Sequence, residues 1–439
     1  MGSSASTLEN EMTSEIREKL AVDLKSQCEN ILKKNSDNRC CKYVLEYLDT
    51  DECKKLSNDD VKIFFKCIRT GIDNTDSGLG CYAMTPTDYK KFGFFFNKVI
   101  RDYHGDISGE KKHVTDWDTG SADYDVKKLG LDELSMRVRV GRNLTGFNLP
   151  GAMDKDERIR FEKRMLPAFD QLIDKYGGKV HSLTPTFGDE EVNPNLISSE
   201  EYKKLVDEHV MFKDMAVDPY LNSAGISNDW PFGRGCWQSS DKMRIIWFGE
   251  EDQLRIMCLK KGSNLLEVFT NLNEMLKTVE GIGGIEFAMD ENYGYVTSCP
   301  SNLGTGMRAS VHVKIPKLTA DGTDTKAKAV CKPLGLSVRG TGGEHTPIGA
   351  DGTVDISPSA RLFIKESEII EKLYEGIEKL MAIENPTGVV NNIADKLSEL
   401  SVACLSPSTS MAEKSPRSLN LAPSPVLAIT AAEVSDESK

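Results

Sequence analysis

The 439-residue sequence lacks the marks of membrane, secreted and metal-binding proteins. No stretch approaches the roughly 18 consecutive apolar residues of a membrane span, and no hydrophobic core of a signal peptide is present. Its 11 cysteines form neither a CxxC motif nor a Cys/His pattern with metal-ligand spacing. They therefore indicate reduced thiols and a cytoplasmic protein. The formal net charge of −13 argues against nucleic acid as the main partner.

Two common phosphate-binding signatures are also absent. The sequence contains no GxxxxGK[ST] loop, and it has neither the HRD nor the DFG motif of protein kinases. Its length and its hydrophobic content of 39% are nevertheless typical of a soluble globular protein with two or three domains. Phosphate binding would therefore need a different arrangement of cations.

Several arginines alternate with apolar residues in segments that look like strands. In MRASVHVKI, Arg308, Ser310 and His312 would share one face and the apolar residues the other. SMRVRVGR and QLRIMCL repeat the pattern, and VRGTGGEHT places an arginine before a glycine-rich loop. Alone, each could be a solvent-facing strand, but guanidinium groups stay charged and match phosphate oxygens, so several on one sheet predict a polyphosphate site. These arginines are Arg137, Arg139, Arg255, Arg308 and Arg339.

The periodicity of the chain divides it into parts. Ile16, Leu20, Leu24 and Cys28 recur every four residues, which predicts an amphipathic helix, and no convincing strand follows until about residue 115. Beyond that point strands alternate with helices. The composition then shifts to Ser, Pro, Ala and Asn, which predicts a largely disordered tail. We expect a flexible N-terminus (1–12), a small all-helical domain (13–115), a linker (116–125), a larger α+β domain (126–385) and the tail (386–439).

The first six residues, MGSSAS, fit the MGxxx[ST] pattern for N-myristoylation, so Gly2 is a candidate acylation site. The alternative is an ordinary Gly/Ser-rich start. A single myristoyl chain gives only marginal membrane binding, and no strong polybasic patch follows it. Any tethering would therefore be weak.

Four of these segments together resemble the phosphagen (ATP:guanidino) kinase family. CPSNLGTGMR is similar to the signature that carries the family's reactive cysteine. GEEDQLR, VRGTGGEHT and SMRVRVGR are similar to its other active-site segments, in the family's order, and the resemblance covers roughly residues 45–384. It implies an α+β fold, with a small all-helical N-terminal domain and a larger domain whose antiparallel β-sheet is flanked by helices. It also implies reversible, Mg²⁺-dependent transfer of the γ-phosphoryl group of ATP to a guanidino compound.

The resemblance also implies roles for individual residues. Two carboxylates would orient the guanidinium, Cys299 would lie beside it as a thiolate, and Glu250 and Asp252 would lie near magnesium-bound waters. Without the resemblance, the acidic cluster could be a simple turn and Cys299 a buried inert thiol. The glycine-rich loop, with His345, would close over ATP and exclude water. The implied catalytic residues are Glu251, Glu344 and Cys299; the nucleotide-binding residues are Arg137, Arg139, His209, Arg255, Arg308, His312 and Arg339; the substrate-binding residues are Ser77, Gly78, Leu79, Gly80 and Tyr82, together with the three catalytic residues.

The segment SGLGCYA is similar to the arginine kinase version of the substrate loop, so we expect L-arginine and phosphoarginine, with ATP and ADP, as the ligands of a monomer. The chain departs from the family's usual asparagine at Gly249 and histidine at Gln253, and at Gly342 from an arginine that is common in arginine kinases. Asn228 replaces an arginine that often pairs with an aspartate at the position of Asp76. Taurocyamine, glycocyamine or creatine as substrate therefore stays open. So does a catalytically weak, acylated scaffold, which Gly2 could tether in a cilium or flagellum.

Overall fold

A computed structural model describes residues 14–188, 191–341 and 346–385. Gly2, Gly342, Glu344, His345 and the tail 386–439 lie outside the described residues, and what the sequence predicts for them stays a prediction. All described residues belong to one compact unit, so the expected domain bounds are not tested either. Within these ranges, no helix has the length and apolar character needed to cross a membrane.

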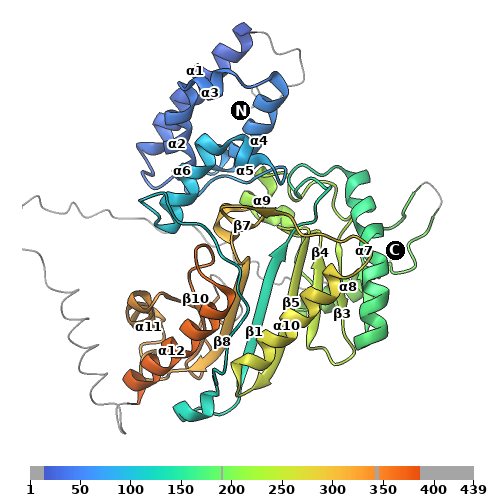
Figure 1. Ribbon diagram of the computed structural model, residues 1–439, viewed down its shortest axis with the longest axis vertical. Helices are drawn as coiled ribbons and strands as arrows, with labels where there is room; N and C mark the ends of the chain where they lie inside the picture. The colour runs from blue at the N-terminus through green and yellow to red at the C-terminus, as the bar shows by residue number, and fades with distance from the viewer. Residues whose placement is uncertain (1–13, 189–190, 342–345, 386–439) are drawn as a thin grey trace, which may run out of the picture. The chain divides into compact units, whose positions relative to one another are not determined.

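The N-terminal part of the described chain is helical, as the sequence predicted (Figure 1). Polar side chains begin its helices: the side chain of Asn38 accepts from the amide of Cys41, and Ser57 accepts from the amide of Asp60. An irregular segment from Asn74 to Thr87 separates two of the helices and contains the expected substrate loop. The helices are α1 (Ser14–Leu32), α2 (Arg39–Leu48), α3 (Asp51–Lys54), α4 (Asn58–Asp73), α5 (Asp88–Lys91) and α6 (Gly93–His104).

An antiparallel sheet follows, with the strand order β2-β3-β4-β5-β1-β8-β10-β9. The central strand β1 pairs with β5 on one side and with β8 on the other, although the three are far apart in the sequence. This confirms the expected α+β fold. The strands are β1 (Leu134–Arg142), β2 (Lys179–Ser182), β3 (Gly235–Gln238), β4 (Arg244–Phe248), β5 (Leu254–Gly262), β8 (Met307–Lys314), β9 (Leu336–Arg339) and β10 (Thr353–Pro358), with a separate β6 (Met289–Asp290) and β7 (Gly294–Tyr295) pair.

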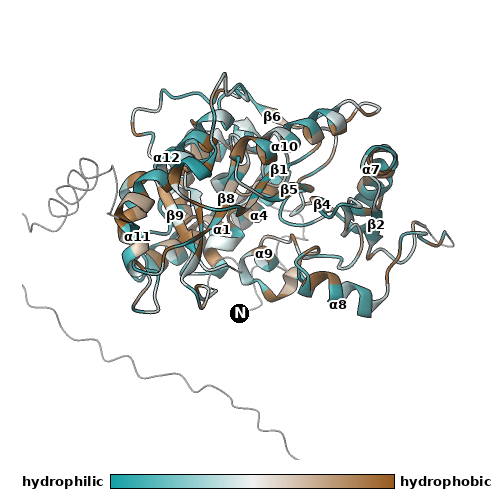
Figure 2. Ribbon diagram, turned by 90° about the horizontal axis from the view of Figure 1, so that it is seen from below, coloured by the Kyte–Doolittle hydropathy of each residue, from teal (hydrophilic) through white to brown (hydrophobic). Residues whose placement is uncertain are grey.

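Helices cover one face of this sheet. Val138 and Val140 of β1 share a buried core with residues of the long helices, such as Leu272 and Ile370. Figure 1 shows α10 and α12 running along the sheet, and Figure 2 shows hydrophobic and hydrophilic residues alternating along the helices. The opposite face of β1 is therefore left to its polar residues. The remaining helices are α7 (Lys155–Tyr176), α8 (Ser199–Asp207), α9 (Pro219–Ser223), α10 (Leu265–Glu280), α11 (Thr325–Cys331) and α12 (Glu366–Glu384), with short 3₁₀ turns between them.

A buried carboxyl group ties α7 to the edge of the sheet. Glu162 is fully buried and accepts hydrogen bonds from the Ser182 hydroxyl (2.6 Å) and the Asn193 amide (3.3 Å), and also from Thr184. These bonds favour the charged form, but burial outweighs them and raises the pKa of Glu162 to about 7. At pH values between 4.5 and about 7, Glu162 therefore holds a proton in the folded protein that it would release in the unfolded chain.

We expect Glu162→Gln to remove a pH dependence of folding stability. Because the folded pKa of about 7 lies above the ordinary value of 4.5, this group's stabilisation is complete below 4.5 and is lost as the pH rises through 7. Between these two values the wild type should lose about 3 kcal/mol of unfolding free energy relative to the variant. Urea titrations at a series of pH values measure this. A difference that stays constant with pH would contradict the assignment.

Candidate active site

The register of the central strands brings the expected arginines onto one face of the sheet. Arg139 of β1 stands opposite Arg308 of β8, and Gly141 of β1 stands opposite Arg255 of β5. Directly paired residues of antiparallel strands project to the same side, so these side chains share the face that the long helices leave uncovered. We call this the arginine face; it consists of Arg137, Arg139, Arg255, Arg308 and Arg339, with His312 and Asp355 among them.

The arginine face carries more positive charge than its carboxylates balance. Arg308 forms an ion pair with buried Asp355, whereas Arg139 has no ion-pair partner among the described residues. Burial, with Arg255 and Arg308 nearby, lowers the pKa of Arg137 to about 10. The same causes, burial first, hold the pKa of Arg139 well below its usual value. Crowded cations of this kind favour the binding of a polyanion.

Trp247 of β4 lies on the same face, because it pairs directly with Arg255. Its ring lies 5.9 Å from the guanidinium of Arg137 and 5.4 Å from that of Arg255. Its indole N–H donates to the carbonyl of Val210 at 2.6 Å. The neighbouring residue, His209, is exposed and has a positive φ of 59°. Its backbone therefore lies at the edge of the arginine face, where a nucleotide-binding role was expected.

The acidic turn after β4 places Glu251 between the arginine face and the segment that contains Cys299. Its Oε2 accepts from Asn302 Nδ2 at 3.3 Å and lies 3.5 Å from Arg255 Nη2. Burial, followed by the charge of Asp252, raises the pKa of Glu251 to about 7, although Arg255 opposes this shift. A carboxyl group with this pKa can hold or release a proton near neutral pH.

We expect Glu251→Gln to lower kcat by up to roughly 10²-fold, because the variant loses the negative charge that would orient a guanidinium. The KM for ATP should change by less than about threefold, since this effect concerns only the acceptor. Steady-state kinetics measure both. Glu46→Gln, at a glutamate paired with Lys98 in the helical part, should change neither. A loss confined to nucleotide affinity would instead place Glu251 around the metal.

The two carboxylates expected near magnesium-bound water differ in their surroundings. Asp252 is only 4% exposed, and its Oδ1 accepts from Asn143 Nδ2 at 2.8 Å and from the amide of Ser298 at 2.7 Å. It therefore fixes the residue before Cys299. Glu250 pairs with Arg255 through Oε1 (2.8 Å), and its buried Oε2 has no hydrogen-bond partner in the described ranges. Of the two, Glu250 fits a metal-bound water better.

The surroundings of Glu250 bear on how a magnesium ion could be held. The part of the chain that the structure describes contains no group of three or more His, Cys, Asp or Glu side chains that could hold a metal ion. The unpartnered oxygen of Glu250 fits a hydrogen bond from a water molecule of Mg²⁺. Magnesium that arrives with a nucleotide and keeps its own waters therefore fits these residues.

Cys299 lies beside Glu251, in surroundings that oppose the thiolate that the resemblance implied. Burial, followed by the charge of Glu251, raises the pKa of Cys299 to about 12, although Ser301, 3.0 Å from Sγ, acts in the other direction. Arg255 is already paired with Glu250 at 2.8 Å. The turn itself is fixed by His104, whose Nε2 lies 2.9 Å from the carbonyl of Pro300.

In the expected substrate loop, the backbone carbonyl groups of residues 78–80 accept hydrogen bonds, whereas their backbone N–H groups have no acceptor among the described residues. The carbonyls of Gly78 and Leu79 accept from the amides of Arg39 and Cys40, both at 3.1 Å, and that of Gly80 accepts from an α4 amide at 2.7 Å. The amide groups of Gly78, Leu79 and Gly80 donate to no acceptor among the described residues. Three successive open N–H groups suit an anionic group such as a carboxylate.

The loop is also joined to the Cys299 segment. Its next residue, Ala83, donates from its amide to the carbonyl of Ser298 at 2.8 Å. Tyr82 is 9% exposed and shares a buried cluster with Cys299, and its pKa is raised by burial and then by the charges of Cys299 and Glu251. The loop, the cysteine and the carboxylate therefore lie together.

Sequence reasoning missed Arg361, which follows β10. Its Nη1 donates to Asn302 Oδ1, so it holds the same asparagine that donates to Glu251. Burial, with Arg308 and Arg339 among the further causes, lowers the pKa of Arg361. The segment SPSAR has no alternation that could have indicated this position. Its position near Arg308 and Arg339 of the arginine face depends on the tertiary structure.

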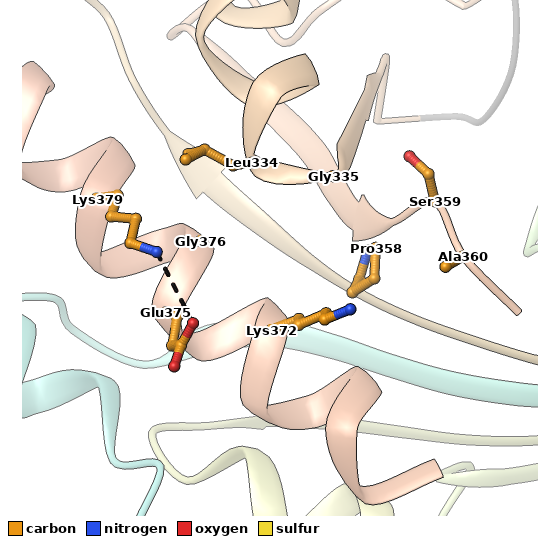
Figure 3. A pocket seen from close by; sticks show the side chains of 9 residues that line it. All are labelled: Leu334, Gly335, Pro358, Ser359, Ala360, Lys372, Glu375, Gly376 and Lys379. Atoms are coloured by element: carbon orange, nitrogen blue, oxygen red, sulfur yellow. Dashed lines mark ion pairs between the residues drawn. The ribbon is translucent and has the colours of Figure 1, made fainter. Parts of the chain in front are cut away.

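The structure also contains a cavity of about 250 Å³ between α12 and the ends of β9 and β10. Figure 3 shows Lys372, Glu375 and Lys379 of α12 along it, with Lys379 Nζ 3.8 Å from a Glu375 oxygen. None of its lining residues belongs to the arginine face or to the substrate loop. The site described above is therefore separate from this cavity.

Comparison with known proteins points to one family for both parts of the chain. Residues 160–387 match the family profile "ATP:guanido phosphotransferase, C-terminal catalytic domain", and residues 34–101 match "ATP:guanido phosphotransferase, N-terminal domain". An arginine kinase of Turbo cornutus is 34% identical over 83% of this chain and 94% of its own length. A testis creatine kinase of Oncorhynchus mykiss is 37% identical over 72% of this chain and 80% of its own length.

Longer relatives and solved structures are also kinases of guanidino compounds by name. The chain spans only 43% of an arginine kinase of Anthopleura japonica, which is 35% identical over 74% of the chain. It also spans 48% of a substrate-free duplicated taurocyamine kinase from Schistosoma mansoni, with a TM-score of 0.67 and 30% identity over 82% of the chain. A lombricine kinase structure matches with a TM-score of 0.63 and 27% identity, over 78% of the chain and 94% of its own length. These relatives differ in the guanidino compound that their names state.

Proposed function

The chain belongs to the ATP:guanido phosphotransferase (phosphagen kinase) family, and we propose that it transfers the γ-phosphoryl group of ATP to L-arginine, giving phosphoarginine and ADP. The observation that carries the proposal is the arginine face with Glu251 and the open amides of the substrate loop beside it. The relatives include arginine, creatine and taurocyamine kinases, so the choice of arginine rests on the substrate loop of this chain.

The arginine face would hold the phosphates of ATP. Transfer of a phosphoryl group spreads negative charge over its oxygens, and fixed cations stabilise that charge better than water does. Arg139, which lacks an ion-pair partner among the described residues, and Arg308 stand side by side on neighbouring strands for this role. Mg²⁺ bound to ATP would neutralise further charge, with Glu250 holding one of its waters.

Glu251 would orient the acceptor and take its proton. A guanidinium is a poor nucleophile, because its charge is delocalised and its pKa exceeds 12. In the transfer, a guanidino nitrogen forms a bond to the γ-phosphorus, the bond from that phosphorus to the ADP oxygen breaks, and one N–H proton leaves. The pKa of about 7 suits the Glu251 carboxylate to accept this proton. Glu344, outside the described residues, is proposed as the second orienting carboxylate.

The substrate loop would bind the other end of the acceptor. The free amides of Gly78, Leu79 and Gly80 match the carboxylate of arginine, and Tyr82 lies near Cys299 and Glu251. A compound that bridges both sites needs a guanidino group at one end and an anion at the other.

A coupled ADP-release assay over a panel of guanidino compounds tests this proposal. We expect the highest kcat/KM for arginine, ahead of creatine, taurocyamine, glycocyamine and lombricine. A preference for one of the others would replace arginine but keep the reaction class. Failure to turn over any of them would favour the alternative of a catalytically weak scaffold.

A further inference from the structure

Hydrogen bonds join the short helix α9 to the base of the substrate loop. The Tyr220 hydroxyl donates to Asp76 Oδ2 at 2.9 Å, and Asn74 Nδ2 donates to Ser223 Oγ at 2.7 Å. Behind them, the Thr70 hydroxyl donates to the carbonyl of Tyr220 at 3.2 Å. The partners are more than 140 residues apart in the sequence, so these bonds link two distant segments.

The α9 side of this link is braced. Asp218 Oδ1 accepts from the amides of Tyr220 (2.8 Å) and Leu221 (3.1 Å), and Ser223 Oγ donates to the carbonyl of Pro219 at 2.7 Å. These bonds hold the short helix in one conformation without any contribution from the loop. A helix held in this way can therefore fix the position of Asp76 and Asn74, which hydrogen-bond to it.

The loop side leads directly to the open amides. Asn74 ends α4, and its carbonyl accepts from the amide of Ser77 at 3.0 Å, with Asp76 between them. The next residues are Gly78, Leu79 and Gly80, whose carbonyls are held by the helical part. The loop is thus fixed from behind by α2 and α4, and at its base by α9.

Asn228 does not take the place of the arginine that the family usually has there. Its carbonyl accepts from Arg234 Nη2 at 2.8 Å, whereas Tyr220 supplies the hydrogen bond to Asp76. A hydroxyl donating to a carboxylate forms a charge-assisted bond, which is stronger than one between neutral groups. In this chain a tyrosine on α9 therefore supports the aspartate.

We propose that α9 is a positioning element for the guanidino substrate, and that Tyr220 and Ser223 hold the loop so that its amides meet the substrate's anionic end. Neither side chain needs to touch the substrate. The inference rests on the proposed function for its kinetic consequence, but the link itself can be measured in the substrate-free protein.

The experiment uses the full chain with the double variant Tyr220→Phe/Ser223→Ala, which alters α9 and leaves the loop sequence intact. The KM for arginine should rise about five- to tenfold, as expected for the loss of one or two such hydrogen bonds, while kcat and the KM for ATP stay within about twofold. Among residues 74–82, the hydrogen-bonded amides of Asn74, Ser77 and Tyr82 should exchange about fivefold faster in the substrate-free protein.

Tyr43→Phe is the matched control, because the Tyr43 hydroxyl donates to Asp102 Oδ2 at 2.7 Å within the helical part. It removes the same kind of bond and should alter neither readout. Wild-type KM and wild-type exchange in the double variant would overturn the inference, and so would equal changes in the control. If the wild type phosphorylates none of the guanidino compounds, the proposed function fails, while exchange at 74–82 still decides whether α9 holds the loop.

Discussion

Arg308→Ala should lower kcat by roughly 10²- to 10³-fold or more, the scale of losing one preorganised donor to a transition state. Arg308 stands opposite Arg139 at the centre of the arginine face, and its strand neighbours Ala309 and Val311 lie in the core on the other side. The substitution therefore removes charge from the site and leaves the packing of β8 in place. Steady-state kinetics with saturating ATP and arginine measure the effect.

Two companion variants separate catalysis from folding. Arg308→Ala leaves the buried Asp355 without its arginine partner and with only His312 Nε2 at 3.7 Å, which costs stability and repels phosphate. The double variant Arg308→Ala/Asp355→Asn removes that charge and should regain stability but not kcat. Arg244→Ala, at a β4 arginine paired with Asp241 outside the arginine face, should keep nearly full turnover. Near wild-type turnover in Arg308→Ala would show that this face does not bind the transferring phosphates.

Substrate choice should give the other large effect: a kcat/KM for arginine two to four orders of magnitude above that for creatine. Creatine is shorter and carries an N-methyl group, so it should leave two or three of the amides of Gly78, Leu79 and Gly80 unpaired. Donors left unpaired beneath a bound substrate cost roughly 1–3 kcal/mol each, and a site built to hydrogen-bond its substrate discriminates strongly against a compound that cannot. Gly342, outside the described residues, stands where arginine kinases commonly have arginine.

Competition assays with both compounds measure this ratio. Comparable kcat/KM values for arginine and creatine would contradict the role given to the loop amides, as would a clear preference for taurocyamine. Either result would leave the arginine face and Glu251 as the phosphoryl-transfer site.

The arginine face was predictable from sequence because its signal is local. Alternation in SMRVRVGR and MRASVHVKI decides which side chains share a face within each strand. The pairing of Arg139 with Arg308 is not local, since it depends on the register of strands that are far apart in the sequence. Nothing in the sequence indicated Arg361 or the bond from Tyr220 to Asp76, because both depend on tertiary packing.

The state of Cys299 could not be obtained from sequence either. The resemblance implied a thiolate, but burial and then the charge of the neighbouring Glu251 raise its pKa. Two departures from the family have structural explanations. Gly249 has a φ of 75°, and a Cβ there would lie 2.0 Å from the carbonyl oxygen of Gly233. Gln253 accepts from the amide of Leu144 and donates to the carbonyl of Asn148, both at 2.8 Å, so it supports the backbone.

Phosphorus NMR of the protein with ATP, Mg²⁺ and L-arginine tests the central claim most directly, because it distinguishes transfer to nitrogen from transfer to water. The account predicts a new P–N resonance that grows in step with ADP, disappears on acid treatment and reverses when excess ADP is added. Release of inorganic phosphate alone, or no loss of ATP with any guanidino compound, would contradict it.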